Sequence, residues 1–585
     1  MEFWGKLPLA WFGVVYATEN SRVIRFGPFE VDLRTHELRK RGLKLKLQQQ
    51  PFQVLVMLLE RAGELVTREE LHTKLWTQDT VVDFDHGLNA AVRRLREALN
   101  DNGGTPRFVE TLPRRGYRFI APVIVPDPGR AASQPSIAVL PFANIGADKE
   151  NEYFGDGLAE EIINALAKTS GLMVAGRTSS FFFRGKDVEL SEIGRRLNVQ
   201  YILEGSVRRA ANHVRMTAQL IGVADGFHVW SDSYDREVTD LFAIQDEITK
   251  SIAEALRIKL SPQAVRPGYR PNLGAYDAYL KAREQLLVRP SSGSGSAVLG
   301  KELLERAIQL DPEFALPYSL LGIYYTGQAS WGVLPAREAI QAARAAEQQA
   351  LRVDGSLPEA HAMMGCCAGM EFAWAEAEQH WSSAMLHEPV PQDVLFWYAN
   401  HYLMPIGRVS EAVDVESKVL ESDPLNLLYR HHLAVSLRHS RRLKEAEAEL
   451  RKVLEVDSNY SLALTTLGAL CAQQGRFPEG LRLTETAYAI ARSALLAGQL
   501  AALLMSTGAN SRAVSLIDSI KSGSAYDSSV GLVVFHALLG QFAEATDYAE
   551  RAIEERYPSF LSVARPLLIS TPQWAFLAKR MNLPA

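Results

Sequence analysis

A spacing of 32 to 34 residues recurs through the C-terminal half of the chain. The glycines at positions 475, 508 and 540 are spaced by 33 and 32 residues, and Asp423 and Asp457 by 34. An interval of this length holds two helices and their turns, and such a unit buries its apolar face only by stacking on its neighbours. The period therefore predicts an all-α array of stacked helix pairs.

The clearest copy of the repeat is "LALTTLGALCAQQGRFPEGLRLTETAYAIA", which begins at Leu462. It resembles a tetratricopeptide repeat. Its large, small and turn positions are Leu464, Leu467, Gly468, Gly475, Phe477, Gly480 and Ala487. The resemblance covers residues 276–560, with 561–585 as a C-terminal cap, and it implies a solenoid whose concave face binds a protein or peptide partner.

Positive charge is concentrated near the N-terminus, although the chain carries a net charge of -5. Residues 22–122 contain 18 Lys and Arg against 13 Asp and Glu, whereas residues 123–585 carry -9. A basic domain joined to an acidic region is typical of a protein in which one domain binds nucleic acid and the rest does not.

The basic domain has the pattern of a winged helix. Short alternating segments before residue 48 predict strands, "QQQPFQVLVMLLERAG" predicts a helix with Phe52, Leu55, Leu58 and Leu59 inside, and Thr67 with Glu70 forms a capping box. Through "FGPFEVD", "VTREELHTKLW", "AVRRLREAL" and "ETLPRRGYRF", residues 23–122 resemble the winged-helix DNA-binding domain of OmpR/PhoB-type regulators, also found in ToxR- and CadC-like proteins.

The predicted third helix, residues 85–99, buries Leu88, Ala91, Val92, Leu95 and Leu99 on one face. The resemblance implies that this helix reads the major groove and that the following hairpin enters the minor groove. Arg and Asn side chains suit both base edges and phosphates, whereas Ala90 and Ala91 predict sparse direct base readout. The candidate DNA-binding residues are His86, Asn89, Ala90, Arg93, Arg94, Arg96, Arg114, Arg115 and Arg118.

A mixed α/β domain is predicted between two linkers, at 123–135 and 261–275. The order of elements is a strand in "SIAVLPF", a helix in "FGDGLAEEIINALAKT", a strand in "LMVAGRTS", a helix in "LSEIGRRLNV", antiparallel strands and a closing helix. Through "AVLPF", "FGDGLAEEI" and "YILEGSVRR", residues 136–260 resemble the TolB N-terminal-like domain that follows winged helices in regulators and some adenylate cyclases.

Two motifs have a catalytic alternative. Asp156 in "FGDGL" fits a phosphate or metal loop but is better explained as a helix entry. "GCCAG" at 365–369 has the form of a nucleophile elbow, yet it falls inside a repeat helix, where small residues serve packing. The three cysteines have no zinc spacing. We therefore expect no enzyme activity, no cofactor and no metal site.

The predicted fold class is multidomain α/β plus α: a winged helix-turn-helix, a mixed α/β domain and a helical solenoid. The predicted function is a bacterial-type, cytoplasmic transcriptional regulator that binds double-stranded DNA, as a monomer or a homodimer, within one-component or phosphorelay-linked signalling. The apolar run in the 1–22 extension is short, and no other apolar run is long enough for a membrane span. The alternatives are a scaffold whose winged helix has lost DNA binding and, more distantly, a nucleotide-processing enzyme.

Overall fold

The computed structural model divides the chain into two compact units, residues 1–133 and 134–585, and each is considered by itself. It describes residues 23–26, 29–32, 37–40, 43–45, 47–75, 84–99, 101–102, 106–121, 134–145, 152–169, 171–210, 213–237, 241–256, 258, 269–288, 294–330, 333–523, 527–558 and 560–584. The predicted N-terminal extension, the turns at 27–28 and 41–42 and most of both predicted linkers lie outside these ranges.

In its described residues, the first unit combines an antiparallel sheet, three helices and a second, smaller sheet. The first sheet has the order β1-β2-β3-β4 and the second the order β5-β7-β6. The bounds of its elements are β1 Val23–Phe26, β2 Phe29–Asp32, β3 Glu37–Lys40, β4 Leu43–Leu45, α1 Gln49–Glu60, β5 Leu65–Thr67, α2 Arg68–Leu75, α3 Phe84–Leu99, β6 Val109–Leu112 and β7 Gly116–Phe119.

One apolar core joins these elements. The four residues predicted for the inner face of α1 are all buried, as are the five predicted for α3, which confirms the helical period read from the sequence. Phe26 and Phe119 meet edge to face with ring centroids 4.9 Å apart, so the first strand packs on the last. The core therefore fixes the hairpin β6–β7 relative to α1 and α3.

The second unit begins with a mixed sheet in the order β10-β8-β11-β12-β13, with β9 paired to β11. Strands β8 and β10 pair in parallel, whereas β12 pairs antiparallel with both β11 and β13. The bounds are β8 Ser136–Val139, β9 Ala143–Asn144, α4 Glu152–Ala167, β10 Met173–Val174, α5 Arg177–Phe181, α6 Leu190–Leu197, β11 Tyr201–Ala210, β12 His213–Gly222, β13 His228–Glu237 and α7 Leu241–Ala255.

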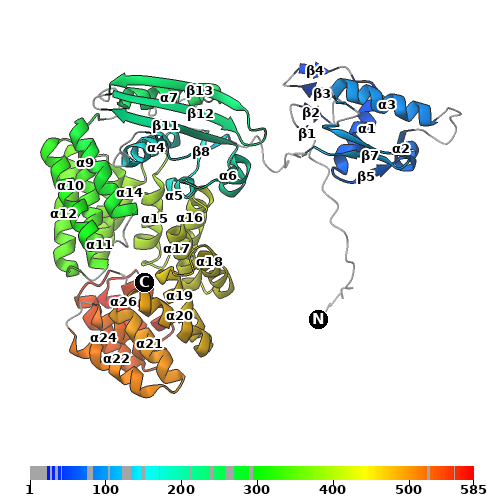
Figure 1. The fold of residues 1–585 in the computed structure, drawn as a ribbon. Coiled ribbons are helices and arrows are strands. Elements are labelled where there is room, and N and C mark those ends of the chain that lie inside the picture. The colour runs from blue at the N-terminus through cyan, green and yellow to red at the C-terminus, as the bar shows by residue number, and fades with distance from the viewer. Residues whose placement is uncertain are drawn as a thin grey trace, which may run out of the picture. The chain divides into compact units, whose positions relative to one another are not determined.

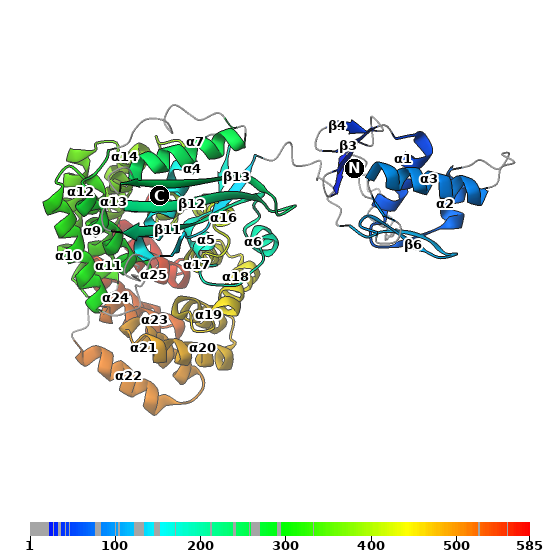
Figure 2. The same cartoon turned by 45° about the horizontal axis from the view of Figure 1, so that its top comes forward.

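Strand β8 shows how the sheet is covered on both faces. Ile137 belongs to the core formed with α4 and α7, and Ala138 to the core formed with α6 and with Phe183, which follows α5, because neighbouring residues of a strand point to opposite faces. Figure 2 shows α7 running beside β12 and β13. The predicted strand "LMVAGRTS" is only partly correct: β10 has two residues, and Arg177 already begins α5.

The helical region follows, and its first helices share a core with the sheet. Tyr276, Tyr279 and Leu280 of α9 are buried together with residues of α4, β11 and α7. The sheet and the first repeats are therefore parts of one compact body. This common core extends through Phe314 and Leu320, just before and within α11, to Ala346 of α12.

Successive helices of this region lie side by side in pairs (Figure 1). Their bounds are α9 Leu273–Arg283, the π-helix η3 Glu284–Val288, α10 Ser294–Leu310, α11 Ala315–Ser330, α12 Ala336–Val353, α13 Pro358–Met370, α14 Trp374–Ala384, α15 Gln392–Tyr398, the π-helix η4 Ala399–Leu403, α16 Val409–Ser422, α17 Leu427–His439, α18 Leu443–Val456, α19 Ser461–Gln473, α20 Phe477–Ile490, α21 Ala494–Ser506, α22 Asn510–Ser522, α23 Ser528–Leu538, α24 Phe542–Glu554, α25 Phe560–Leu568 and α26 Trp574–Arg580.

From α13–α14 through α23–α24, the turn inside each pair has one residue in the left-handed region. The three turn glycines of the sequence pattern have φ of +74°, +88° and +74°. Phe372, Gly407 and Arg441 have positive φ at the preceding turns, so the period continues upstream with spacings of 35, 34 and 34 residues. Two of these three are not glycine, which is why the sequence pattern missed them.

Close packing within a pair depends on small residues. A Cβ placed on Gly468 of α19 would lie 2.5 Å from Oγ1 of Thr484 on α20, closer than real Cβ contacts come. A larger residue would therefore push the two helices apart. This confirms the role predicted for Gly468 from the repeat pattern.

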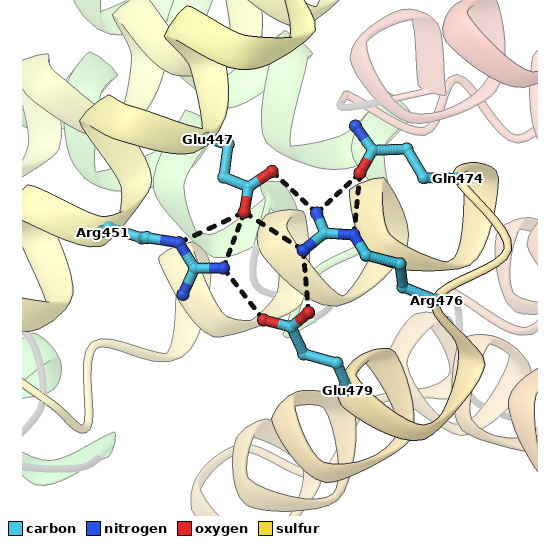
Figure 3. A network of polar contacts seen from close by, with 5 residues as sticks. All are labelled: Glu447, Arg451, Gln474, Arg476 and Glu479. Carbon is cyan, nitrogen blue, oxygen red and sulfur yellow. Dashed lines mark hydrogen bonds and ion pairs between the residues drawn. The ribbon is translucent and has the colours of Figure 1, made fainter.

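Ion pairs connect the helix pair α17–α18 to the next helix pair, α19–α20, on their exposed side (Figure 3). Arg476, just after the turn at Gly475, donates to Oε2 of Glu447 at 2.7 Å and to Oε2 of Glu479 at 2.7 Å. Arg451 donates to the same two carboxylates, so α18 and α20 share a four-residue network. Exposed pairs contribute little singly, and the network mainly fixes the register between repeats.

The helical region places its apolar side chains in cores between helices. In the described part of the chain, no helix is both long and apolar enough to cross a membrane. The three cysteines are buried and unbridged, two in α13 and one in α19. Their role is packing.

Candidate nucleic-acid interface

Helix α3 presents an exposed polar face opposite its buried one. Arg93 is largely exposed, with its side chain 73% accessible and its Nε 3.8 Å from Oε1 of Glu97. Arg94 is also exposed and hydrogen-bonds to the side-chain oxygen of Gln48. Ala90 is half-buried, and the side chain of His86 lies outside the described residues. Of this face, Arg93 is the cation best placed to meet a phosphate.

Arg96 has a different position from its neighbours on α3. Its Nη2 donates to the backbone oxygen of Val109 at 2.6 Å and to Oγ1 of Thr111 at 2.8 Å. Both acceptors belong to β6, so Arg96 holds α3 against the hairpin β6–β7. Because the guanidinium is used in this way, we assign Arg96 a structural role in addition to its positive charge.

The wing is the hairpin β6–β7, closed by a tight turn. The backbone N–H of Arg115 donates to the carbonyl of Leu112 at 3.0 Å, and Arg114 has φ of +61°. A Cβ on Gly116 would lie 2.1 Å from the carbonyl oxygen of Val66, so only glycine fits where β7 meets β5. The side chains of Arg114 and Arg115 are therefore held at the exposed tip.

The remaining predicted wing residue, Arg118, lies further down the hairpin. It is half-exposed, and its Nε is 3.6 Å from Oε2 of Glu110 on the partner strand. The carboxylate offsets part of its charge. Arg118 therefore offers a weaker cation than the two arginines at the tip.

A hydrogen-bond network joins α2, α3 and the wing. The hydroxyl of Tyr117 on β7 donates to Oδ1 of Asn89 on α3 at 2.9 Å, and Nη2 of Arg68 on α2 donates to the same oxygen at 3.1 Å. The guanidinium of Arg68 also lies 5.5 Å from the centre of the Tyr117 ring. Sequence reasoning missed Arg68 and Tyr117 because their partner is brought to them only by the tertiary fold.

The capping box predicted at the start of α2 is present. The N–H of Thr67 donates to Oε2 of Glu70 at 2.7 Å, and the N–H of Glu70 donates to Oγ1 of Thr67 at 3.2 Å. The hydrogen bond from the Thr67 backbone is the main reason that the pKa of Glu70 is lowered to about 2. Hydrogen bonds from Arg61 and from the Thr67 hydroxyl lower it further. Helix α2, and with it Arg68, is thereby fixed at its first turn.

An open cleft of about 660 Å³ lies between α3 and the wing. Its walls include Arg68, Asn89, Arg93, Arg96 and Tyr117, with Glu97 and Asp101 as the acidic members. Guanidinium and amide donors gathered beside an exposed helix and a basic hairpin tip suit phosphate oxygens and the acceptor atoms of bases. This lining is suited to binding an anionic or hydrogen-bond-accepting ligand.

The two motifs with a catalytic alternative are both helical. Asp156 lies in the first half of α4 and forms an ion pair with Arg184. The "GCCAG" segment lies in α13, without the preceding strand that a nucleophile elbow requires, and burial raises the pKa of the Cys366 thiol well above its usual range. Among the described residues, no group of three or more His, Cys, Asp or Glu could hold a metal ion.

Two family models match the chain. Residues 42–119 match "Transcriptional regulatory protein, C terminal", and residues 133–251 match "HilA/YgeH-like transcriptional regulator, second domain". The second match covers the region with the TolB-like resemblance, which stays a prediction. Each model covers less than half of the chain.

Proteins of two kinds are similar over longer stretches. "Putative adenylate cyclase 3" of Rhizobium meliloti (strain 1021) is 39% identical over 242 residues, which is 40% of this chain and 40% of that protein. "Transcriptional regulator HilA" of Salmonella typhimurium (strain LT2) is 25% identical over 398 residues, which is 65% of this chain and 67% of HilA. The chain thus spans less than half the length of the rhizobial relative.

Among solved structures, the Klebsiella pneumoniae RstA DNA-binding domain in complex with the RstA box is 28% identical. The similarity covers 17% of this chain and 97% of that one, with a TM-score of 0.16. Together with the matched family models, the architecture of the first unit gives a coarse assignment. Residues 42–119 belong to a winged-helix domain of OmpR/PhoB type, and a HilA-like domain follows it.

Proposed function

We propose that this chain is a DNA-binding transcriptional regulator whose first unit contacts double-stranded DNA. The observation that carries the proposal is the common placement of Arg93, Arg114 and Arg115: all three are exposed, on the helix and the hairpin tip of a winged-helix domain. Cations in this arrangement can follow a phosphate backbone on both sides of a groove. His86, Asn89, Ala90, Arg94, Arg96 and Arg118 complete the proposed interface.

The rest of the chain is proposed to regulate this binding. We divide it into a linker at 123–135, an α/β domain at 136–260, a linker at 261–275, tetratricopeptide repeats at 276–560 and a cap at 561–585. The repeats would hold a protein or peptide partner on their concave face. The protein would act in the cytoplasm without enzyme activity, and a homodimer on DNA is part of the same proposal.

The experiment that tests DNA binding uses the full chain and duplexes enriched from a randomised pool. Arg93→Ala and Arg115→Ala should each weaken binding and reduce the slope of log affinity against log salt by about one unit. Arg39→Ala is the matched control, because Arg39 is exposed in the same unit but lies on β3 and is paired with Glu37. Equal affinity and salt slope in all variants would contradict the proposed interface.

A second candidate function is suggested by the rhizobial relative, which is named as a putative adenylate cyclase. A nucleotide-processing activity would require carboxylates that hold a metal ion beside the substrate phosphates. Incubation of the full chain with ATP and Mg²⁺ or Mn²⁺, followed by chromatography of the products, tests it directly. Release of cyclic AMP or pyrophosphate would favour this candidate over a regulator without enzyme activity.

A further inference from the structure

The side-chain oxygen of Asn89 is already saturated with hydrogen bonds. Its Oδ1 accepts from the hydroxyl of Tyr117 at 2.9 Å and from Nη2 of Arg68 at 3.1 Å. An amide oxygen has two lone pairs, and these two donors occupy both. A third donor, such as the amino group of a base, would have to displace one of them.

The chemistry of Arg68 fixes which way the amide of Asn89 is turned. A guanidinium has only donors, so the atom of Asn89 that contacts Arg68 must be the oxygen. The amino group, Nδ2, is then the other end of the same amide. No described residue is recorded as accepting a hydrogen bond from Nδ2, and Asn89 is exposed at the cleft beside the wing.

This orientation changes what Asn89 can read. An asparagine reads adenine by accepting from N6 and donating to N7 at the same time. With its oxygen occupied, Asn89 keeps only the donor half of that pattern. We propose that Asn89 acts as a donor only and selects a base edge with a major-groove acceptor, such as purine N7, guanine O6 or thymine O4. This inference rests on the DNA binding proposed above.

The network is held in place by the fold. Tyr117 is buried, and its strand β7 is paired on both sides, with β5 and with β6. Arg68 is fixed by the hydrogen bond from its backbone N–H to the carbonyl of Arg115 at 3.2 Å and by the cation–π contact of its guanidinium with the Tyr117 ring. The donors on Oδ1 are therefore in place before DNA arrives, and turning the amide would cost both hydrogen bonds.

The test begins with duplexes that the full-length protein enriches from a randomised pool. The position read by Asn89 is the one whose base preference is lost in Asn89→Ala. At that position, a 7-deazapurine removes the N7 acceptor and purine deoxyriboside removes the 6-amino donor of adenine. If thymine is preferred there, an analogue without O4 replaces the 7-deazapurine, and if guanine is preferred, an analogue without O6 is tested beside it.

We expect removal of the acceptor to weaken binding about tenfold, as for the loss of one hydrogen bond, and removal of the 6-amino group to change affinity less than about twofold. The double variant Arg68→Met with Tyr117→Phe frees Oδ1. In that variant the 6-amino group should contribute, and adenine should gain about fivefold over guanine. Circular dichroism of Asn89→Ala and of the double variant checks that the first unit is still folded.

The outcomes separate this inference from the proposed function. Equal losses on removing the acceptor and the 6-amino group from adenine would overturn donor-only reading while leaving DNA binding intact. Sequence selection that is unchanged in Asn89→Ala would overturn it as well. Failure of the full chain to enrich any sequence would overturn the proposed function and this inference together.

Discussion

Oδ1 of Asp423 accepts a hydrogen bond from the backbone N–H of Ser179 at 2.7 Å, across 244 residues of sequence. Asp423 follows α16 of the repeats and is buried, whereas Ser179 lies in the short helix α5 of the α/β region. The hydroxyl of Ser179 in turn accepts the N–H of Leu425 at 2.8 Å. These bonds hold the α/β region against the middle of the helical array, far from where the chain joins them.

We predict that Asp423→Ala destabilises this junction. The N–H of Ser179 would lose its acceptor in a buried site, which costs on the order of 1–3 kcal/mol of unfolding free energy. Chemical denaturation of the full chain, followed by far-ultraviolet circular dichroism, measures the change. A second transition would indicate that the α/β region and the repeats no longer unfold together.

Asp457 provides the matched control for Asp423. It stands one repeat later at the equivalent position, but it is exposed, and its carboxylate accepts the local backbone N–H of Asn459 at 2.9 Å. Asp457→Ala should therefore cost less than about 1 kcal/mol. Equal losses in the two variants would show that the bond to Ser179 adds nothing to stability.

Glu416 makes stability depend on pH. Burial raises the pKa of this carboxyl to about 8 from an ordinary value of 4.5, so the folded chain keeps a proton that the unfolded chain releases. Its contribution to stability is therefore present at low pH and is lost as pH rises through the folded pKa. Between pH 7 and pH 9 the free energy of unfolding should fall by about 1 kcal/mol through this group.

Glu416→Gln should remove this loss, and denaturant titrations at pH 7, 8 and 9 measure it as a difference from the unsubstituted chain. Glu445→Gln is the control, because Glu445 is paired with Arg442 and its pKa is lowered. The buried histidines do not interfere in this window: burial lowers the pKa of His431 to about 4 and of His439 to about 3. A pH slope in Glu416→Gln as steep as that of the unsubstituted chain would rule out Glu416 as a source, because other buried carboxyls such as Glu347, whose pKa burial also raises, account for any smaller remainder.

The periodic parts of the fold could be predicted from the sequence. The inner faces of α1 and α3 and the capping box at Thr67 follow from residue types a few positions apart, and each is present. The repeat period was readable from the glycines at 475, 508 and 540. It was hidden at Phe372 and Arg441, where the fold imposes the left-handed conformation on residues that do not favour it.

Contacts between distant segments could not be predicted in this way. Nothing local to Asn89 indicates that Arg68 and Tyr117 will saturate its oxygen, or that Arg96 will bond to β6 instead of facing outward. The same holds for Ser179 and Asp423. Each pairing depends on how whole elements pack, so sequence reasoning proposed the charged face of α3 but not the division of roles within it.

The turn glycines provide a test of backbone strain. Gly475 has φ of +74°, and a Cβ there would meet no other atom within 4 Å. Gly475→Ala should therefore destabilise the chain only through its backbone, by about 1 kcal/mol. Thermal or denaturant unfolding of the full chain measures this loss.

Gly327 is the control for this effect, because it lies inside α11 with the same open surroundings. Gly327→Ala should stabilise the chain by up to about 1 kcal/mol, since alanine favours helix over glycine. The two substitutions add the same methyl group and are expected to have opposite signs. A loss of stability in both would mean that space, and not backbone conformation, decides the outcome.

Arg93 and Arg96 are three residues apart on α3, and we predict that replacing Arg96 mainly lowers stability whereas replacing Arg93 mainly lowers DNA affinity. Arg96→Ala removes the bonds to Val109 and Thr111, so the first unit should lose about 1–3 kcal/mol of unfolding free energy. Arg93→Ala removes a side chain that is 73% accessible and should change stability by less than about 0.5 kcal/mol. Urea unfolding followed by intrinsic fluorescence of the full chain distinguishes them, because only Arg96→Ala should move a transition midpoint.

DNA titration at low temperature, where both variants are folded, should show the larger loss of affinity for Arg93→Ala. The reverse order of affinities would make Arg96 the phosphate contact and would mean that its bonds to β6 exchange for DNA on binding.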